Sequence, residues 1–208
     1  PLRRFFRSSG IYTAQGHGHA NRYQLFLERT LALTKPNGRF GLILPSGLAT
    51  DHGSAHLRRR LLDGCAVDTW IGLDNKAGIF PIHRSMRFIL LAATTSGRTD
   101  VLKFRSGLQD PAVLDGYASD PRQDRASDCL SVSRSRLEAW DPERLSVPSL
   151  TSLAALAILT TAAAAAPPLG SARGWHAQFG RELNATDDRA HFVRRPEPSA
   201  GMPRRRTH

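Results

Sequence analysis

The histidines and cysteines of this chain could ligate a metal or take part in hydrolysis. The two cysteines, Cys65 and Cys129, lie far apart, with no cysteine or histidine at ligand spacing, so the sequence supports neither a zinc site nor a disulfide framework. Seven of the eight histidines have no serine, aspartate or metal-ligand partner at informative spacing: His17, His19, His52, His56, His176, His191 and His208. We therefore predict no metal site and no hydrolytic triad.

Positive charge is the strongest compositional feature. The 208 residues include 29 lysines and arginines against 18 acidic residues, a formal net charge of +11. Cationic side chains gain affinity for a polyanion by releasing its condensed counterions, which favours nucleic acid as a partner. Because 26 of the 29 cations are arginines, coding bias is a second explanation, with most arginines on a solvated face. We interpret the consecutive arginines at 58–60 in this second way, since neighbouring positions spread around a helix.

The length suits one domain with extensions, since 208 residues are few for two complete cores. No stretch approaches the roughly 20 apolar residues of a spanning helix. Residues 1–7 are basic without the apolar core of a signal peptide, and the chain begins without Met. We expect a cytoplasmic protein and an incomplete chain.

Apolar periodicity predicts an α/β fold. A helix of about 14 residues begins at Asn21 and stops at the turn formed by 35–38, because Pro36 disfavours a helical residue before it. The other predicted elements are strands at 39–45, 66–73 and 86–93, an edge strand at 101–104, and helices at 54–63 and 151–166. The strands at 66–73 and 86–93 are too close for an intervening helix, which favours an antiparallel hairpin. We expect an irregular stretch at 106–150.

Several of these segments resemble the adenine-specific DNA methyltransferases of the amino-methylating class, as in fused restriction-modification enzymes. In that family an N-x-Y-x-x-F-x-E helix precedes L-x-K-P-G-G and a strand that ends in proline, and a V/I-F-P segment follows. Here the matching parts are Asn21–Arg29, Leu33–Pro45 and Gly78–Ser85, in the same order, and the resemblance covers 1–95. Residues 167–189 resemble the junction before the recognition domain of the longer enzymes.

The resemblance implies a fold and site residues. The fold would be the second half of a Rossmann-like sheet with a terminal antiparallel hairpin, dependent on S-adenosylmethionine and acting on double-stranded DNA. Phe80 would stack on the target base and Phe26 would line the cofactor site, although either ring could instead belong to the core. His83 and Arg84 would contact DNA phosphate or lie in a solvated loop.

The resemblance also implies an order of parts. Residues 1–105 would belong to the catalytic domain, 106–189 would lead to the target-recognition region, and 190–208 would form a disordered basic tail. A nuclease and a recognition domain would be fused or separate partners.

Two sequence elements of the family are missing from these residues. The chain contains neither the F-x-G-x-G loop for the methionine moiety nor the N/D-P-P-Y/F tetrapeptide for the target amine. We therefore assign no catalytic residue and expect the isolated chain to be inactive. Two alternatives remain: a noncatalytic basic module that binds nucleic acid on the same scaffold, and a methyltransferase for small molecules. Strong salt dependence of DNA binding would argue against the latter.

Overall fold

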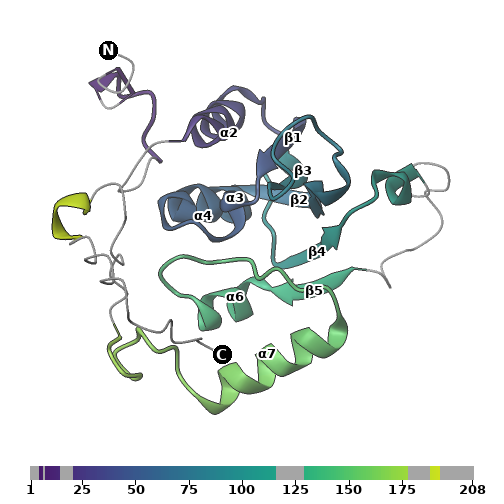
Figure 1. Cartoon of the computed structure of the whole chain (residues 1–208). Helices are drawn as coiled ribbons and strands as arrows, with labels where there is room; N and C mark the ends of the chain where they lie inside the picture. The colour runs from purple at the N-terminus through teal and green to yellow at the C-terminus, as the bar shows by residue number, and fades with distance from the viewer. Residues whose placement is uncertain (1–4, 7, 15–20, 116–128, 178–187, 193–208) are drawn as a thin grey trace, which may run out of the picture. The chain divides into compact units, whose positions relative to one another are not determined.

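The computed structural model describes residues 5–6, 8–14, 21–115, 129–177 and 188–192 (Figure 1). The chain divides into two compact units, 1–168 and 169–208. Most of the expected basic tail, 193–208, lies outside the described residues.

A mixed five-stranded sheet organises the first unit. Its strands are β1 (Arg39–Pro45), β2 (Cys65–Asp74), β3 (Arg87–Thr95), β4 (Val101–Leu108) and β5 (Leu130–Ser133). Their order is β1-β3-β2-β4-β5. Strand β3 is antiparallel to both β1 and β2, whereas β2 and β4 are parallel and β4 and β5 are antiparallel. Strands β1, β2 and β4 therefore share one direction, and their carboxyl ends meet at one edge.

Helices connect and cover these strands. The α-helices are α2 (Arg22–Leu33), α3 (Gly47–Thr50), α4 (Ala55–Gly64), α6 (Arg134–Trp140) and α7 (Leu153–Ala165). Short 3-10 turns are η1 (His52–Ser54), η2 (Asn75–Ala77), η3 (Pro111–Leu114) and η5 (Arg189–His191). Helix α2 begins with a capping box in which the backbone N–H of Asn21 donates to Oε1 of Gln24 at 3.1 Å. No helix in the described part of the chain is long and apolar enough to cross a membrane.

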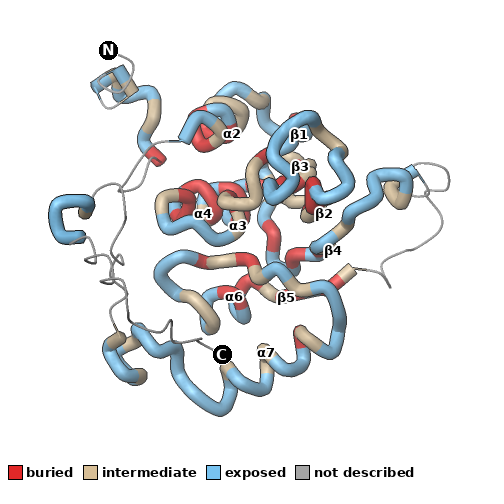
Figure 2. The backbone as a smooth tube through the Cα atoms, in the orientation of Figure 1, coloured by how far each residue is buried: buried red, intermediate tan, exposed pale blue. Residues whose placement is uncertain are grey.

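One apolar core joins the helices to the sheet. Its fully buried members include residues of α2, α4, α6 and the strands, among them Leu27, Leu57, Leu61, Leu91, Leu102, Phe104 and Leu137. Figure 2 shows buried backbone concentrated where α4 lies beside the sheet. Burying one such side chain stabilises the fold by roughly 1.5 to 3 kcal/mol.

The stretch expected to be irregular at 106–150 contains regular structure. Strand β5 and helix α6 lie within it, and both contribute buried residues to the core. Strand β4 is not an edge strand, because β2 pairs with its second half and β5 with its first half. The hairpin of β2 and β3 does not end the sheet, since β4 and β5 continue beyond β2.

The interpretation of 58–60 as a solvated face was wrong for Arg58, which is fully buried. Its Nη1 donates to the carbonyl oxygens of Leu48 at 2.9 Å and Asp51 at 2.8 Å. Its Nε and Nη2 donate to the carbonyl of Arg144 at 3.0 and 2.7 Å. Burial lowers the pKa of Arg58 to about 10, so the side chain stays a cation at neutral pH. Its hydrogen bonds therefore join Arg144, in the segment after α6, to Leu48 and Asp51, which follow β1.

Candidate nucleic-acid interface

The candidate site lies at the sheet edge where β1, β2 and β4 end and β3 begins. Pro45 is opposite Phe88 across the β1–β3 pair, and Asp74 is opposite Arg87 across the β2–β3 pair. Open α/β sheets bind their ligands at this carboxyl edge. The loop that joins β2 to β3 therefore lies where a ligand is expected.

Asn75 holds this loop in shape. Its side chain is fully buried, and its Oδ1 accepts a hydrogen bond from the backbone N–H of Phe80 at 2.9 Å. Its Nδ2 lies 3.2 Å from the carbonyl oxygens of Phe80 and Ile82 and 3.3 Å from that of His83. One amide side chain thus fixes the backbone on both sides of the Phe80 ring.

The Phe80 ring packs against Phe88 and borders a hollow. The two rings meet edge to face, with centroids 4.9 Å apart and planes at 69°. Phe80 is half-buried, whereas Phe88 belongs to the buried set. A hollow of about 330 Å³ lies beside them, lined by Ile43, Pro45, Phe80, Pro81, Ile82, Met86, Arg87 and Phe88. All of these except Arg87 are apolar, so the hollow suits a flat, weakly polar ring.

His83 and Arg84 are both exposed on the same loop. Nδ1 of His83 lies 2.7 Å from Oγ of Ser85. Nη1 of Arg84 donates to the carbonyl of Lys76 at 2.8 Å. A Cβ placed on Gly78, whose φ is +78°, would lie 3.2 to 3.3 Å from the Arg84 guanidinium, so glycine permits this close approach.

Asp74 lies between two cations at the end of β2. Its Oδ2 is 3.6 Å from Nζ of Lys76 and 3.9 Å from Nε of Arg87. The Asp74 side chain is 10% exposed, whereas those of Lys76 and Arg87 are 64% and 62% exposed. The Oδ1 atom of Asp74 accepts from the backbone N–H of Lys76 at 3.2 Å, which caps η2.

A second hollow, of about 460 Å³, adjoins the first. The two share Arg87 and Phe88, and the second is lined by more polar side chains, among them those of Ser46, Thr50, Asp74, Gln109, Ser149 and Thr151. Arg87 and Phe88 therefore line both hollows, and the second one, the groove, combines hydroxyl groups with apolar residues such as Trp70 and Ile89.

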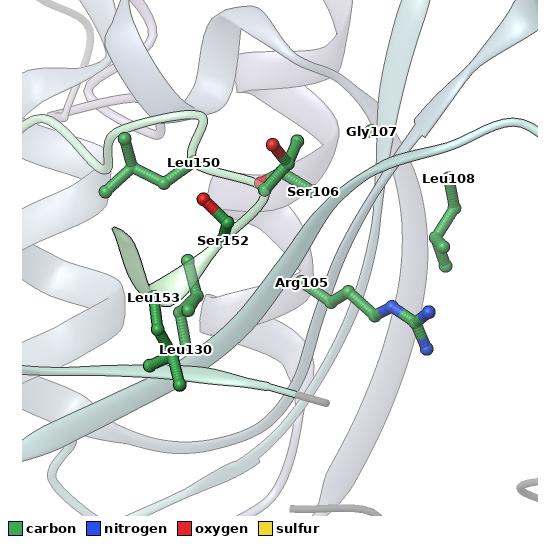
Figure 3. A pocket seen from close by; sticks show the side chains of 9 residues that line it. Arg105, Ser106, Gly107, Leu108, Leu130, Leu150, Ser152 and Leu153 are labelled. Atoms are coloured by element: carbon green, nitrogen blue, oxygen red, sulfur yellow. The ribbon is translucent and has the colours of Figure 1, made fainter. Parts of the chain in front are cut away.

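A third hollow, of about 430 Å³, shares Ser106, Gly107 and Thr151 with the second. Figure 3 shows Leu150, Ser152 and Leu153 grouped on one side of this hollow, while the Arg105 side chain extends away from them. Gly107 has φ +79°, and a Cβ there would lie 2.9 Å from Cγ2 of Thr151. The close approach of β4 to the chain before α7 therefore depends on glycine.

Phe26 lies elsewhere, on the outer face of α2. It is 69% exposed, so the alternative that it belongs to the core is wrong. It lines a hollow of about 610 Å³ with Phe6, Tyr12, Leu25, Arg29, Thr30, Leu33 and Thr34. Phe26 and Phe80 line different hollows. Of the site residues expected from the sequence, Phe80, His83 and Arg84 share the β2–β3 loop, and Phe26 is apart from them.

Sequence reasoning missed Asn75, Asp74 and Arg87. Two signals were available: an asparagine directly after a strand, and an acid opposite a basic residue on the neighbouring strand. Both can be recognised only when the ends and the register of the strands are known. Within the described residues, no group of three histidine, cysteine or acidic side chains could hold a metal ion.

The described fold is mixed α/β, with the candidate site at the carboxyl ends of β1, β2 and β4. Residues 5–80 match the family model described as Eco57I restriction-modification methylase. This match covers less than half of the chain and ends at Phe80.

A solved structure described as a "modification subunit of a putative type I restriction enzyme" from Vibrio vulnificus YJ016 has a similar fold. The TM-score is 0.51 at 20% sequence identity, and the alignment covers 66% of this chain and 34% of that one. This chain thus spans about a third of its solved relative. No curated protein matches this sequence.

Proposed function

We propose that this chain is part of a site-specific DNA methyltransferase that methylates the 6-amino group of adenine, in a restriction-modification or phage-defence system. The family match over residues 5–80 carries this proposal, because it covers the helix α2, the strand β1 and the loop up to Phe80. In this interpretation β1, β2 and β3 form the second half of a Rossmann-like sheet. Residues 1–105 are its catalytic part, and 106–189 lead to target recognition.

Phe80 is the proposed stacking residue for the target base. A base must leave the duplex before its amine can be methylated, and the lost stacking must be replaced. Stacking on an aromatic side chain contributes about 1 to 3 kcal/mol per base. The half-buried Phe80 ring beside the apolar hollow supplies such a surface, and its backbone is fixed by Asn75.

Contacts to the DNA backbone are proposed for His83 and Arg84. Arg84 uses Nη1 to bind the Lys76 carbonyl, and a guanidinium has five N–H donors. Its remaining donors can form paired hydrogen bonds with a phosphate. The net charge of +11 agrees with double-stranded DNA as the partner.

S-adenosylmethionine is the usual methyl donor of methylases, and we propose it for the complete enzyme. The hollow beside Phe26 offers aromatic walls from Phe6, Tyr12 and Phe26 that suit an adenine ring. Its lining residues include no carboxylate for ribose hydroxyls and no glycine-rich turn. The described residues therefore fit at most one wall of a cofactor site. They do not fit the whole cofactor, and no step of the transfer is assigned to them.

A noncatalytic basic module that binds nucleic acid is the second candidate, favoured by the net charge alone. A nuclease and a recognition domain, fused or separate, are the further partners that methylation for defence would require.

The test uses the full-length protein read from the encoding DNA around this chain, expressed in a host without adenine methylation. We expect N6-methyladenine in host DNA by mass spectrometry of nucleosides, and its loss in Phe80→Ala. Phe80→Trp keeps a stacking surface and should retain methylation. DNA binding without N6-methyladenine would favour the basic module. Absence of salt-sensitive DNA binding would instead favour a small-molecule substrate.

A further inference from the structure

The cations around the β2–β3 loop outnumber its acids. Residues 74–87 contain Lys76, Arg84 and Arg87 against the single carboxylate of Asp74. A carboxylate with little exposure requires compensating partners, and Asp74 has two cations within 4 Å. Because one negative charge faces both Lys76 and Arg87, one positive charge remains for another anion.

The geometry leaves Lys76 and Arg87 accessible to that anion. Both side chains are more than 60% exposed, and their separations from Oδ2 of Asp74 exceed a direct hydrogen bond. Asp74 and Arg87 are opposite each other in the β2–β3 pair, so strand register sets the position of Arg87.

Arg87 lines both hollows, as does Phe88. The hollow beside Phe80 is apolar apart from Arg87, whereas the groove combines apolar residues with hydroxyl and amide side chains from Ser46, Thr50, Ser149 and Gln109. A nucleotide likewise joins a flat base to an anionic phosphodiester. Hydroxyl, amide and arginine groups are typical donors to DNA phosphates.

We propose that Arg87 and Lys76, oriented by Asp74, bind the phosphodiester next to the extruded base. The base lies against Phe80, and the backbone of the same strand runs along the sheet edge beside Arg87 and Lys76. Asp74 is a positioning residue in this arrangement. This proposal rests on the function proposed above, because the position of the phosphodiester is inferred from a target base that stacks on Phe80.

Arg39 provides a matched control for Arg87. Both arginines begin a strand of the same sheet, and both approach an aspartate, with Nη2 of Arg39 3.4 Å from Oδ2 of Asp68. The Arg39 side chain is 68% exposed, close to the value for Arg87. Arg39 pairs with Thr94 and Arg87 with Asp74, so the two arginines occupy opposite ends of the sheet.

The experiment compares Arg87→Ala and Arg39→Ala in the full-length protein by fluorescence anisotropy with a labelled adenine-containing duplex. Arg87→Ala should reduce the slope of log affinity against log salt by about 1, whereas Arg39→Ala should leave it unchanged. Affinity at fixed salt should fall roughly tenfold in Arg87→Ala alone. Where N6-methyladenine forms, a neutral methylphosphonate beside the methylated adenine should weaken wild-type binding and should not weaken binding by Arg87→Ala further.

Equal salt slopes for the two variants would overturn the phosphodiester assignment. If N6-methyladenine still formed, the proposed methyltransferase function would stand without the phosphodiester assignment. A slope change confined to Arg87→Ala, in a protein that makes no N6-methyladenine, would support the phosphodiester site and count against methyl transfer. Absence of DNA binding by the wild-type protein would overturn both.

Discussion

Asn75 and Phe80 exchange hydrogen bonds through one side chain. Oδ1 of Asn75 accepts from the Phe80 N–H at 2.9 Å, and Nδ2 of Asn75 lies 3.2 Å from the Phe80 carbonyl oxygen. An amide side chain is suited to this double role because it has both an acceptor and donors. The exposed loop that presents the candidate stacking ring is thereby anchored in a buried position at the end of β2.

Replacing Asn75 by Ala should uncouple the loop from the sheet. The Phe80 N–H and the carbonyls of Phe80, Ile82 and His83 would lose a partner, at a cost of about 1 to 3 kcal/mol in unfolding free energy. We also expect methylation to fall as far as in Phe80→Ala. Urea denaturation and N6-methyladenine analysis measure the two effects.

Asn21→Ala is the control for Asn75→Ala. Asn21 caps α2, so its loss should cost about 1 kcal/mol without moving the Phe80 loop. Asn75→Asp keeps the acceptor for the Phe80 N–H but places a carboxylate oxygen against the carbonyls of Phe80, Ile82 and His83, so it should retain no more activity than Asn75→Ala. If the loss of methylation followed the loss of unfolding free energy equally in Asn75→Ala and Asn21→Ala, this result would argue against a positioning role for Asn75.

Arg58→Met should destabilise the protein more than other arginine substitutions. The change leaves the carbonyls of Leu48, Asp51 and Arg144 without their buried donor. We expect a loss on the order of 3 to 5 kcal/mol in unfolding free energy, because three buried carbonyl groups lose their donor. Arg136→Met, at an exposed position on α6, should change stability by less than about 0.5 kcal/mol. Similar urea midpoints for the two variants would contradict the role assigned to Arg58.

The sequence predicted those elements whose apolar pattern is strong. Strand β1 and strand β3 are nearly continuous apolar runs, and α4 presents leucines at helical spacing. Strand β5 was missed because its four residues lie in a stretch rich in serine, arginine and aspartate, where only Leu130 and Val132 alternate inward. Helix α6 was missed for the same reason, since Leu137 is its one buried apolar residue.

The site was predicted only where local sequence carried the information. The loop with Phe80, His83 and Arg84 was recognisable from its Ile-Phe-Pro segment. Asp74 and Arg87 become neighbours through strand register, which a linear sequence does not contain. The buried face of α2 includes Gln24 and Glu28 as well as leucines, whereas Phe26 lies on the exposed face, so the apolar pattern alone could not decide between core and site for Phe26.

Stability should fall at alkaline pH in part through Cys65. Burial raises the pKa of the Cys65 thiol above its ordinary value of 9.0. The folded protein therefore keeps a proton that the unfolded chain releases, and this contribution is complete below pH 9 and is lost as pH rises through the folded pKa. Cys65→Ala should be less stable at neutral pH by about 1 kcal/mol and should lose less on going to higher pH. Parallel pH profiles of unfolding free energy for the two proteins would contradict the raised pKa.

Glu28 should control how firmly the segment before α2 is held. Its carboxylate is 1% exposed, and Oε1 accepts from the backbone N–H groups of Thr13 at 2.5 Å and Ala14 at 2.8 Å. Nη1 of Arg60 lies 3.7 Å from the same oxygen. Glu28→Gln replaces charge-assisted hydrogen bonds by neutral ones, so the Thr13 and Ala14 amides should exchange hydrogen roughly tenfold faster, measured by NMR. Arg60→Gln keeps the carboxylate and should have a smaller effect. Unchanged exchange at both amides in Glu28→Gln would show that other contacts hold this segment.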